Sequence, residues 1–142
     1  MCRALHASRW LVLSISAWAS VGCADPGRTA ESDLKRIGAA YHGYSARMFV
    51  GPANADDLQT YLEKTPETYA SLKAGRYIVI WKVSPEELKR AAAKGGPKLA
   101  DQVLGYEADV PTSGGKAVMV DGSIRTLSAA EFQEAPKAKP KK

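Results

Sequence analysis

The chain has few of the residues from which catalytic and metal sites are most often built. Among its 142 residues are two cysteines and two histidines, and Cys2 and His6 stand within the first ten positions. His42 is then the one histidine that remains, whereas a zinc site needs three or four ligands and a Ser-His relay needs partners at fixed positions. We therefore expect no enzymatic activity, no metal and no cofactor.

A clustered basic surface is missing as well, although the formal net charge is +5. Arg3 and Arg9 stand near the start, and four lysines stand in the last six positions. Without these six of the 20 Lys and Arg, 14 remain against 15 Asp and Glu, so the body of the chain is close to neutral. Nucleic-acid-binding domains gather Lys and Arg on one face, so we expect no nucleic-acid partner.

Long apolar runs are absent beyond one short run near the start. Segment 10–21 (WLVLSISAWASV) comes after Arg3 and Arg9, an order typical of a secretory signal peptide. It is shorter than the roughly 20 apolar residues that span a bilayer, and no later run reaches that length. The sequence therefore predicts a signal peptide at 1–22 and an exported protein whose remaining part is soluble.

The end of this run leaves two alternatives open. Residues 20–23 (SVGC) resemble a bacterial lipobox, in which the cysteine thiol receives a diacylglycerol and becomes the new N-terminus, although Ser20 stands where Leu is usual. Lipid at Cys23 would anchor the protein to a membrane on the periplasmic side of the cell envelope, with residues 23–31 as a flexible tether. Cleavage after Ala24 would instead release a soluble secreted protein.

The rest of the chain alternates between helix and strand patterns. Five apolar residues at spacings of three and four predict an amphipathic helix over about 29–47: Leu34, Ile37, Tyr41, Tyr44 and Met48. Asp121-Gly122 is a strong signal for a hairpin turn between two short strands. Further helices are predicted near 54–62, 66–74, 84–94 and 128–132, and strands at 76–83, 103–110, 116–120 and 123–127, with a loop at 111–115.

These elements predict an α+β fold, in which an N-terminal amphipathic helix packs on a small, mostly antiparallel sheet with short helices around it. Segment 76–83 (RYIVIWKV) is apolar on both faces, which indicates an inner strand of that sheet. We expect a single domain over 32–134 and a disordered basic tail over 135–142.

Two features are candidates for binding. Tyr77 and Trp81 share one face of the predicted strand, where they either fill the core or stack on a small ligand such as a sugar. The lysines of the tail either attract an anionic polymer of the envelope or only help to keep the protein in solution.

Two motifs together resemble a known family. Segment 34–44 (LKRIGAAYHGY) resembles the LKQIGLAxHNY helix of planctomycete prepilin-like proteins, relatives of the type II secretion major pseudopilin. Segment 114–125 (GGKAVMVDGSIR) is similar to the closing GGxxxxxDGSVR hairpin of that family. The chain departs from the family in having Pro111 where a histidine is usual. It also has a lipobox-like site in place of the prepilin leader and its long apolar helix.

The resemblance implies the fold of a pseudopilin head without filament assembly, and it brings no catalytic residue. We therefore expect a non-enzymatic, exported, lipid-anchored envelope protein with a structural or binding role. The alternative is a soluble secreted module that binds a small ligand or glycan through the aromatic face at Tyr77 and Trp81.

Overall fold

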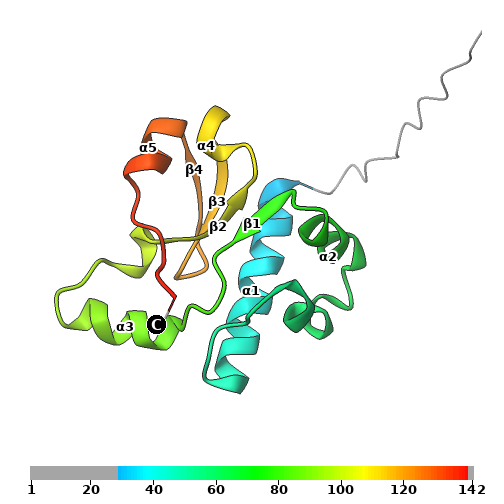
Figure 1. Cartoon of the computed structure of the whole chain (residues 1–142), viewed down its shortest axis with the longest axis horizontal. Helices are drawn as coiled ribbons and strands as arrows, with labels where there is room; N and C mark the ends of the chain where they lie inside the picture. Colours follow the sequence, from blue (N-terminus) through cyan, green and yellow to red (C-terminus); the bar gives the residue numbers. More distant parts are fainter. Residues whose placement is uncertain (1–28, 141–142) are drawn as a thin grey trace, which may run out of the picture.

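A computed structural model describes residues 29–140 of the chain. These residues form an α+β fold of helices around one antiparallel sheet, as the sequence predicts (Figure 1). The elements follow in the order α1 (Ala30–Met48), 3-10 helices η1 (Ala55–Leu58) and η2 (Thr60–Leu62), α2 (Pro66–Lys73), β1 (Tyr77–Val79), α3 (Pro85–Ala93), η3 (Leu99–Asp101), β2 (Val103–Glu107), α4 (Val110–Ser113), β3 (Gly115–Met119), β4 (Ile124–Leu127) and α5 (Ala129–Glu134).

The four strands lie in the sheet in their order along the chain, each antiparallel to the next. The turn between β3 and β4 is at Asp121-Gly122, where the sequence places it. Gly122 takes a φ of 85°, which favours glycine, and the Asp121 carboxylate accepts a 2.9 Å hydrogen bond from the Ser123 amide.

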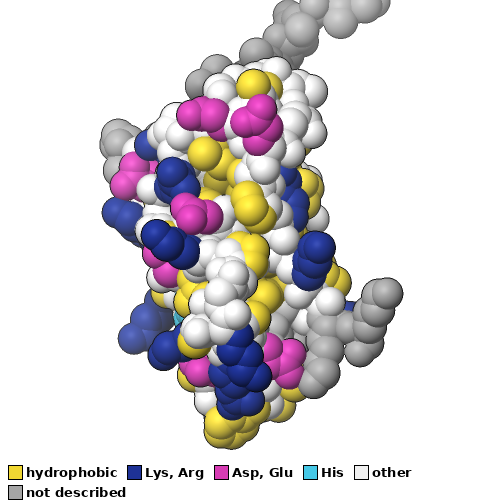
Figure 2. Space-filling model, turned by 90° about the vertical axis from the view of Figure 1, so that its left-hand side faces the viewer, with side chains coloured by type: hydrophobic (Ala, Val, Ile, Leu, Met, Phe, Trp, Pro, Cys, Tyr) yellow, Lys and Arg dark blue, Asp and Glu magenta, His cyan; other side chains and the backbone are white. Residues whose placement is uncertain are grey.

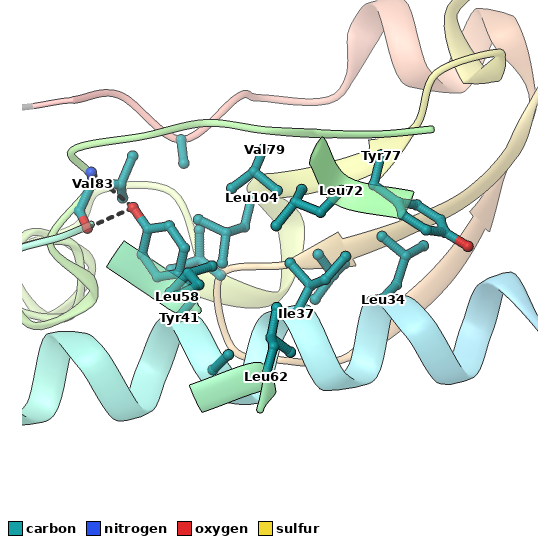
Figure 3. Close-up of a cluster of buried hydrophobic side chains, with 14 residues drawn as sticks. Leu34, Ile37, Tyr41, Leu58, Leu62, Leu72, Tyr77, Val79, Val83 and Leu104 are labelled. Carbon is teal, nitrogen blue, oxygen red and sulfur yellow. Dashed lines mark hydrogen bonds between the residues drawn. The ribbon is translucent and has the colours of Figure 1, made fainter. Parts of the chain in front are cut away.

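Helix α1 covers one face of the sheet, and four residues of its predicted apolar stripe pack in the main core, whereas the fifth, Met48, is exposed (Figure 3). Thr29 and Ser32 form a capping box at its first turn. Leu34, Ile37 and Tyr41 are fully buried, and they pack with Leu58, Leu62 and Leu72 from the following helices and with Val79 and Leu104 from the sheet. This packing stabilises α1, whose helix propensity is lowered by two internal glycines, Gly38 and Gly43.

The far end of α1 carries exposed apolar side chains. Met48 is 51% exposed, Phe49 81% and Val50 55%. Figure 2 shows apolar side chains at this lower end of the molecule, and above it Lys and Arg interspersed with Asp and Glu. The face in view therefore has no large field of one charge sign.

Short helices α4 and α5 cover the opposite face of the sheet. A second apolar cluster lies there, formed by Val103 of β2, Ala117 and Met119 of β3, and Val110, Leu127 and Phe132. The Phe132 and Tyr106 rings have their centroids 4.6 Å apart. Ser128 and Glu131 form a capping box at the start of α5, where the sequence predicts a short helix.

The prediction of an inner strand over 76–83 is wrong. Strand β1 has three residues and lies at the edge of the sheet, with Ile78 39% exposed. The Tyr41 hydroxyl accepts a 2.9 Å hydrogen bond from the Val83 amide and donates a 3.0 Å hydrogen bond to the Val83 carbonyl oxygen. Lys82 has a positive φ of 60°. The chain is thereby turned out of the sheet after Ile80, and Val83 enters the core beside α1 instead.

The expected strand end and loop over 108–115 contain helix α4 instead. Its backbone bonds run from the Ser113 amide to the Asp109 carbonyl (2.8 Å) and from the Gly114 amide to the Val110 carbonyl (3.1 Å). Pro111 stands in the first turn of α4. Backbone amides in a first turn have no acceptor within the helix, so the missing N–H of proline costs no hydrogen bond there.

The prediction of disorder from residue 135 onward is also wrong for the described part of the tail. The Val103 amide donates to the Pro136 carbonyl (2.8 Å), the Ala138 amide donates to the Val103 carbonyl (2.9 Å), and Ala138 is buried. The Lys137 amine donates to the carbonyls of Phe132 and Ala135, and its burial lowers its pKa. The tail thus pairs with Val103 at the start of β2, where β1 no longer pairs with that strand. At the other boundary, α1 already includes the last two residues of the expected 23–31 tether.

Candidate functional site

A shallow groove of about 350 Å³ runs beside the outer edge of β1. Strand β1 and Trp81 form one side of it, and η1 and the end of α2 form the other. Its lining consists of Asn54, Ala55, Asp56, Leu72, Lys73, Gly75, Tyr77, Ile78, Val79 and Trp81.

One edge of β1 is paired with β2, and the other edge lies on the side of the groove. Arg76 accepts from the Ala108 amide (3.0 Å), and the Ile80 amide donates to the Leu104 carbonyl (2.8 Å). Ile78 is paired with Tyr106 in the same register. Because alternate residues of an antiparallel strand point their amide and carbonyl groups to opposite sides, those of Tyr77 and Val79 point away from β2, but the two residues are only 4% and 6% exposed, so little of this edge is accessible.

An ion pair holds the opposite side of the groove together. The Lys73 amine and the Tyr69 hydroxyl each donate a 2.7 Å hydrogen bond to Asp56. The bond from Lys73, followed by that from Tyr69, lowers the pKa of Asp56, and the same carboxylate raises the pKa of Lys73 and of Tyr69. These contacts join η1 to α2, and Asn54 caps η1 through the Asp56 amide (2.8 Å).

Comparison with protein-family models, with curated proteins and with solved structures found no match to this chain. The resemblance to prepilin-like proteins therefore stays a prediction.

The two predicted aromatic contacts have different places in the structure. Tyr77 is 4% exposed, so its ring belongs to the core and offers no face to a ligand. Its hydroxyl donates to the Asp33 carboxylate (3.0 Å), and burial, followed by that carboxylate, raises the pKa of Tyr77 to about 12. Trp81 is partly exposed and lines the groove. Of the predicted pair, Trp81 is the side chain that a ligand can reach.

The carboxylate beside Tyr77 is a structural group. Asp33 is 1% exposed and also accepts a 2.7 Å hydrogen bond from the Thr68 hydroxyl, while Arg36 lies 3.6 Å away. These bonds join the first turn of α1 to α2 and to β1. Such a satisfied, water-excluded carboxylate stabilises the position of the groove's two sides.

Sequence reasoning missed the ion pair that forms the groove's second side. In the structure Asp57 accepts from the Ala53 amide (2.7 Å), whereas Asp56 reaches across to α2. The available signal was the spacing of Tyr69 and Lys73, which are four residues apart and so share one face of a helix.

Other candidate features lie elsewhere in the described part of the chain. A groove of about 390 Å³ lies between η2 and α2, lined by polar side chains with Leu62, Pro66 and Tyr69. Within residues 29–140, no three His, Cys, Asp or Glu side chains are grouped as a metal site would require. The Nε2 atom of His42 is buried beside the β3–β4 turn, with no hydrogen-bond partner among the described residues.

The predicted signal peptide at 1–22 and the lipid-attachment site Cys23 lie outside the described residues. Among the helices of the described part, none is both long and apolar enough to cross a membrane. In the basic tail, Lys137 is bound at the end of α5, and Lys139 is exposed. Lys141 and Lys142 fall beyond the described range, so attraction of an anionic polymer stays a prediction.

Proposed function

We propose that this chain is an exported, lipid-anchored protein of the cell envelope, with a structural or binding role and no enzymatic one. Binding takes place in the groove beside β1. The observation that carries the binding role is the groove itself, which combines a partly exposed tryptophan with a second side fixed by an ion pair. Its lining offers apolar surface and hydrogen-bonding groups, which suit recognition.

The proposed anchor is supported by the sequence around Cys23. A positively charged start, a short apolar run and Gly22-Cys23 precede small polar residues. The first described residue, Thr29, stands six positions after Cys23. Residues 29–140 contain no other cysteine, so the proposed acylation consumes the one thiol that an oxidising compartment would otherwise expose. An N-terminal helix on an antiparallel sheet also accords with the pseudopilin-head-like role that the resemblance implies.

The mass of the protein isolated from membranes tests the anchor. We expect a mass increase of one diacylglycerol plus one acyl chain, and we expect Cys23→Ala to lack the increase and to leave the membrane fraction. The same unmodified mass in both proteins, with the parent in the soluble fraction, would reject the anchor.

A soluble secreted module that binds a small ligand or glycan is the second candidate, and the partial exposure of Trp81 in the groove favours it. After removal of residues 1–22, Trp81 is the one tryptophan of the chain, because Trp10 and Trp18 belong to the leader. Its fluorescence therefore reports directly on the groove. Saturable quenching by a short oligosaccharide, together with an unmodified Cys23, would support this candidate.

A further inference from the structure

We propose that the groove beside β1 and the groove between η2 and α2 form one elongated site, which binds a linear, uncharged oligosaccharide. This inference rests on the proposed binding role of the groove beside β1 and names its ligand class. It adds the η2–α2 groove, with Tyr69, as a second part of the site. It applies to an anchored and to a soluble protein alike.

The two grooves adjoin at the ion pair between η1 and α2. Asp56 and Lys73 line the groove beside β1, and Tyr69 lines the η2–α2 groove. The Tyr69 hydroxyl donates to Asp56, the same carboxylate that binds Lys73, and both bonds are 2.7 Å long. Tyr69 and Lys73 stand four residues apart on one face of α2. A ligand that lies along this face therefore reaches both grooves, which favours an extended ligand over a compact one.

Each groove offers one partly exposed aromatic ring. Trp81 lines the groove beside β1, and Tyr69 lines the η2–α2 groove. The hydrogen bond to Asp56 fixes the Tyr69 ring before a ligand arrives. The face of an aromatic ring carries partial negative charge, which attracts the C–H groups on the flat side of a sugar ring. The two aromatic rings can therefore stack on different sugar units of one chain.

The polar groups around these rings suit sugar hydroxyls. Asn54 and Gln59 offer side-chain amides and Thr60 offers a hydroxyl, and all three residues are exposed. The side chains of Asp56 and Lys73, although bound to each other, are still 62% and 49% exposed. Amides, hydroxyls and this ion pair place donors beside acceptors, as sugar hydroxyls themselves do. A peptide strand would instead need the edge of β1, little of which is accessible.

Charges of both signs are interspersed along the site. In the lining, Asp56 is bound to Lys73, and Glu63 is exposed. Beside the lining stand further side chains of both signs: Lys64, Arg76, Lys82, Glu107 and Asp109. A charged polymer would meet attraction and repulsion together, so these charges select neither sign. An uncharged chain is the ligand that this mixture favours.

Oligosaccharide titration of the exported protein, isolated after signal removal, tests this inference. The uncharged probes are chitohexaose and chitobiose, whose acetamide groups match the side-chain amides of Asn54 and Gln59. The anionic probe is an oligogalacturonate of the same length as chitohexaose. Trp81 fluorescence measures all three affinities. Tyr69→Ala removes the ring from the η2–α2 groove, and Tyr61→Ala is the matched control, because Tyr61 lies on η2 outside both linings.

We expect chitohexaose to change Trp81 fluorescence saturably and to bind at least about tenfold more tightly than chitobiose, because it occupies both grooves at once. Tyr69→Ala should weaken chitohexaose binding by about threefold to tenfold, through the loss of one stacked ring, and leave chitobiose binding unchanged. Tyr69→Phe keeps the ring and should retain most of the affinity, and Tyr61→Ala should change neither ligand. Oligogalacturonate should bind more weakly than chitohexaose.

Equal affinities of chitohexaose and chitobiose, or equal chitohexaose binding by the parent and Tyr69→Ala, would overturn the inference. Equal loss of both ligands in Tyr69→Ala would also overturn it, since the ring would then only support the fold. Oligogalacturonate that binds as tightly as chitohexaose would do the same. In all these cases Trp81 of the parent still responds to a ligand, so the binding role of the groove beside β1 stands. A Trp81 signal that no probe alters would overturn both the inference and that binding role.

Discussion

Replacing Gly38 with alanine tests how closely α1 lies on the sheet. A Cβ atom at position 38 would lie 2.9 Å from a methyl carbon of Val118, where ordinary contacts between carbons are about 3.5–4.0 Å. Val118 is fully buried in β3 and has no room to retreat. Alanine gains about 1 kcal/mol of helix propensity, whereas overpacking a core costs roughly 1–3 kcal/mol. We therefore expect Gly38→Ala to lower the free energy of unfolding by about 1 kcal/mol.

Gly43 in the same helix provides the matched control. A Cβ there would lie 3.1 Å from two carbons of the Tyr61 ring, which is 36% exposed on η2 and can tilt away. Gly43→Ala should therefore stabilise the protein by up to about 1 kcal/mol. Urea unfolding followed by Trp81 fluorescence and by circular dichroism measures both changes.

A double-mutant cycle separates the clash from other effects. Val118→Ala creates a cavity that the new methyl group of Gly38→Ala partly fills, so the pair should be more stable than the sum of the single changes by about 1 kcal/mol. If Gly38→Ala stabilised the protein as much as Gly43→Ala does, the argument that glycine is needed for close packing here would be refuted.

Two further changes test local features of the fold. Tyr41→Phe leaves the buried Val83 amide without its acceptor and should cost about 1–3 kcal/mol in urea unfolding. Burial raises the pKa of Tyr41 to about 12, above the value of about 10 expected in the unfolded chain, so its contribution is complete below pH 10 and is lost as the pH rises toward 12. A wild-type stability curve without that alkaline decline would contradict this assignment. Phe49→Gly should stabilise by about 0.5–1 kcal/mol, because Phe49 ends α1 in the left-handed conformation (φ 60°) that glycine adopts without strain. Phe49→Ala keeps that strain and should show no gain; equal gains in thermal unfolding would refute the explanation.

The parts of the fold that the sequence predicts are those with local causes. The helices predicted at 84–94 and 128–132 each begin at a serine whose side chain accepts a hydrogen bond from an amide three residues away. The β3–β4 turn depends on Asp121 and Gly122 alone. Because each of these signals lies within a few consecutive residues, the sequence is enough to predict where the helices begin and where the turn falls.

The errors have distant causes. Segment 76–83 has the composition of a buried strand, but it leaves the sheet because Tyr41, which is 42 residues from Val83, holds the turn. The tail has the composition of a disordered segment, yet Pro136 and Ala138 bond to Val103. Composition describes what a segment can do alone, whereas these two segments are placed by one or two specific bonds to residues elsewhere.

The candidate site was predictable only in part for the same reason. Trp81 stands out in the sequence because it is aromatic and lies in an apolar run. The second side of the groove depends on Asp56 reaching Lys73, which is 17 residues away, and no spacing rule connects them. The edge position of β1 could not be predicted at all, because the sequence indicates an inner strand there.

The proposed anchor also constrains where the groove lies. The first turn of α1 lies beside β1 and α2, since Asp33 accepts hydrogen bonds from both Tyr77 and Thr68 (Figure 1). The six residue steps from Cys23 to Thr29 reach at most about 20 Å when extended. A lipid at Cys23 would therefore hold the groove near the bilayer, while the far end of α1, about 28 Å away at 1.5 Å per residue, carries the exposed Phe49. A ligand that enters the groove would then bind close to the membrane surface. Lengthening the tether by a flexible insertion after Ala24 should weaken capture of a membrane-bound ligand and leave quenching of Trp81 fluorescence by a free ligand unchanged.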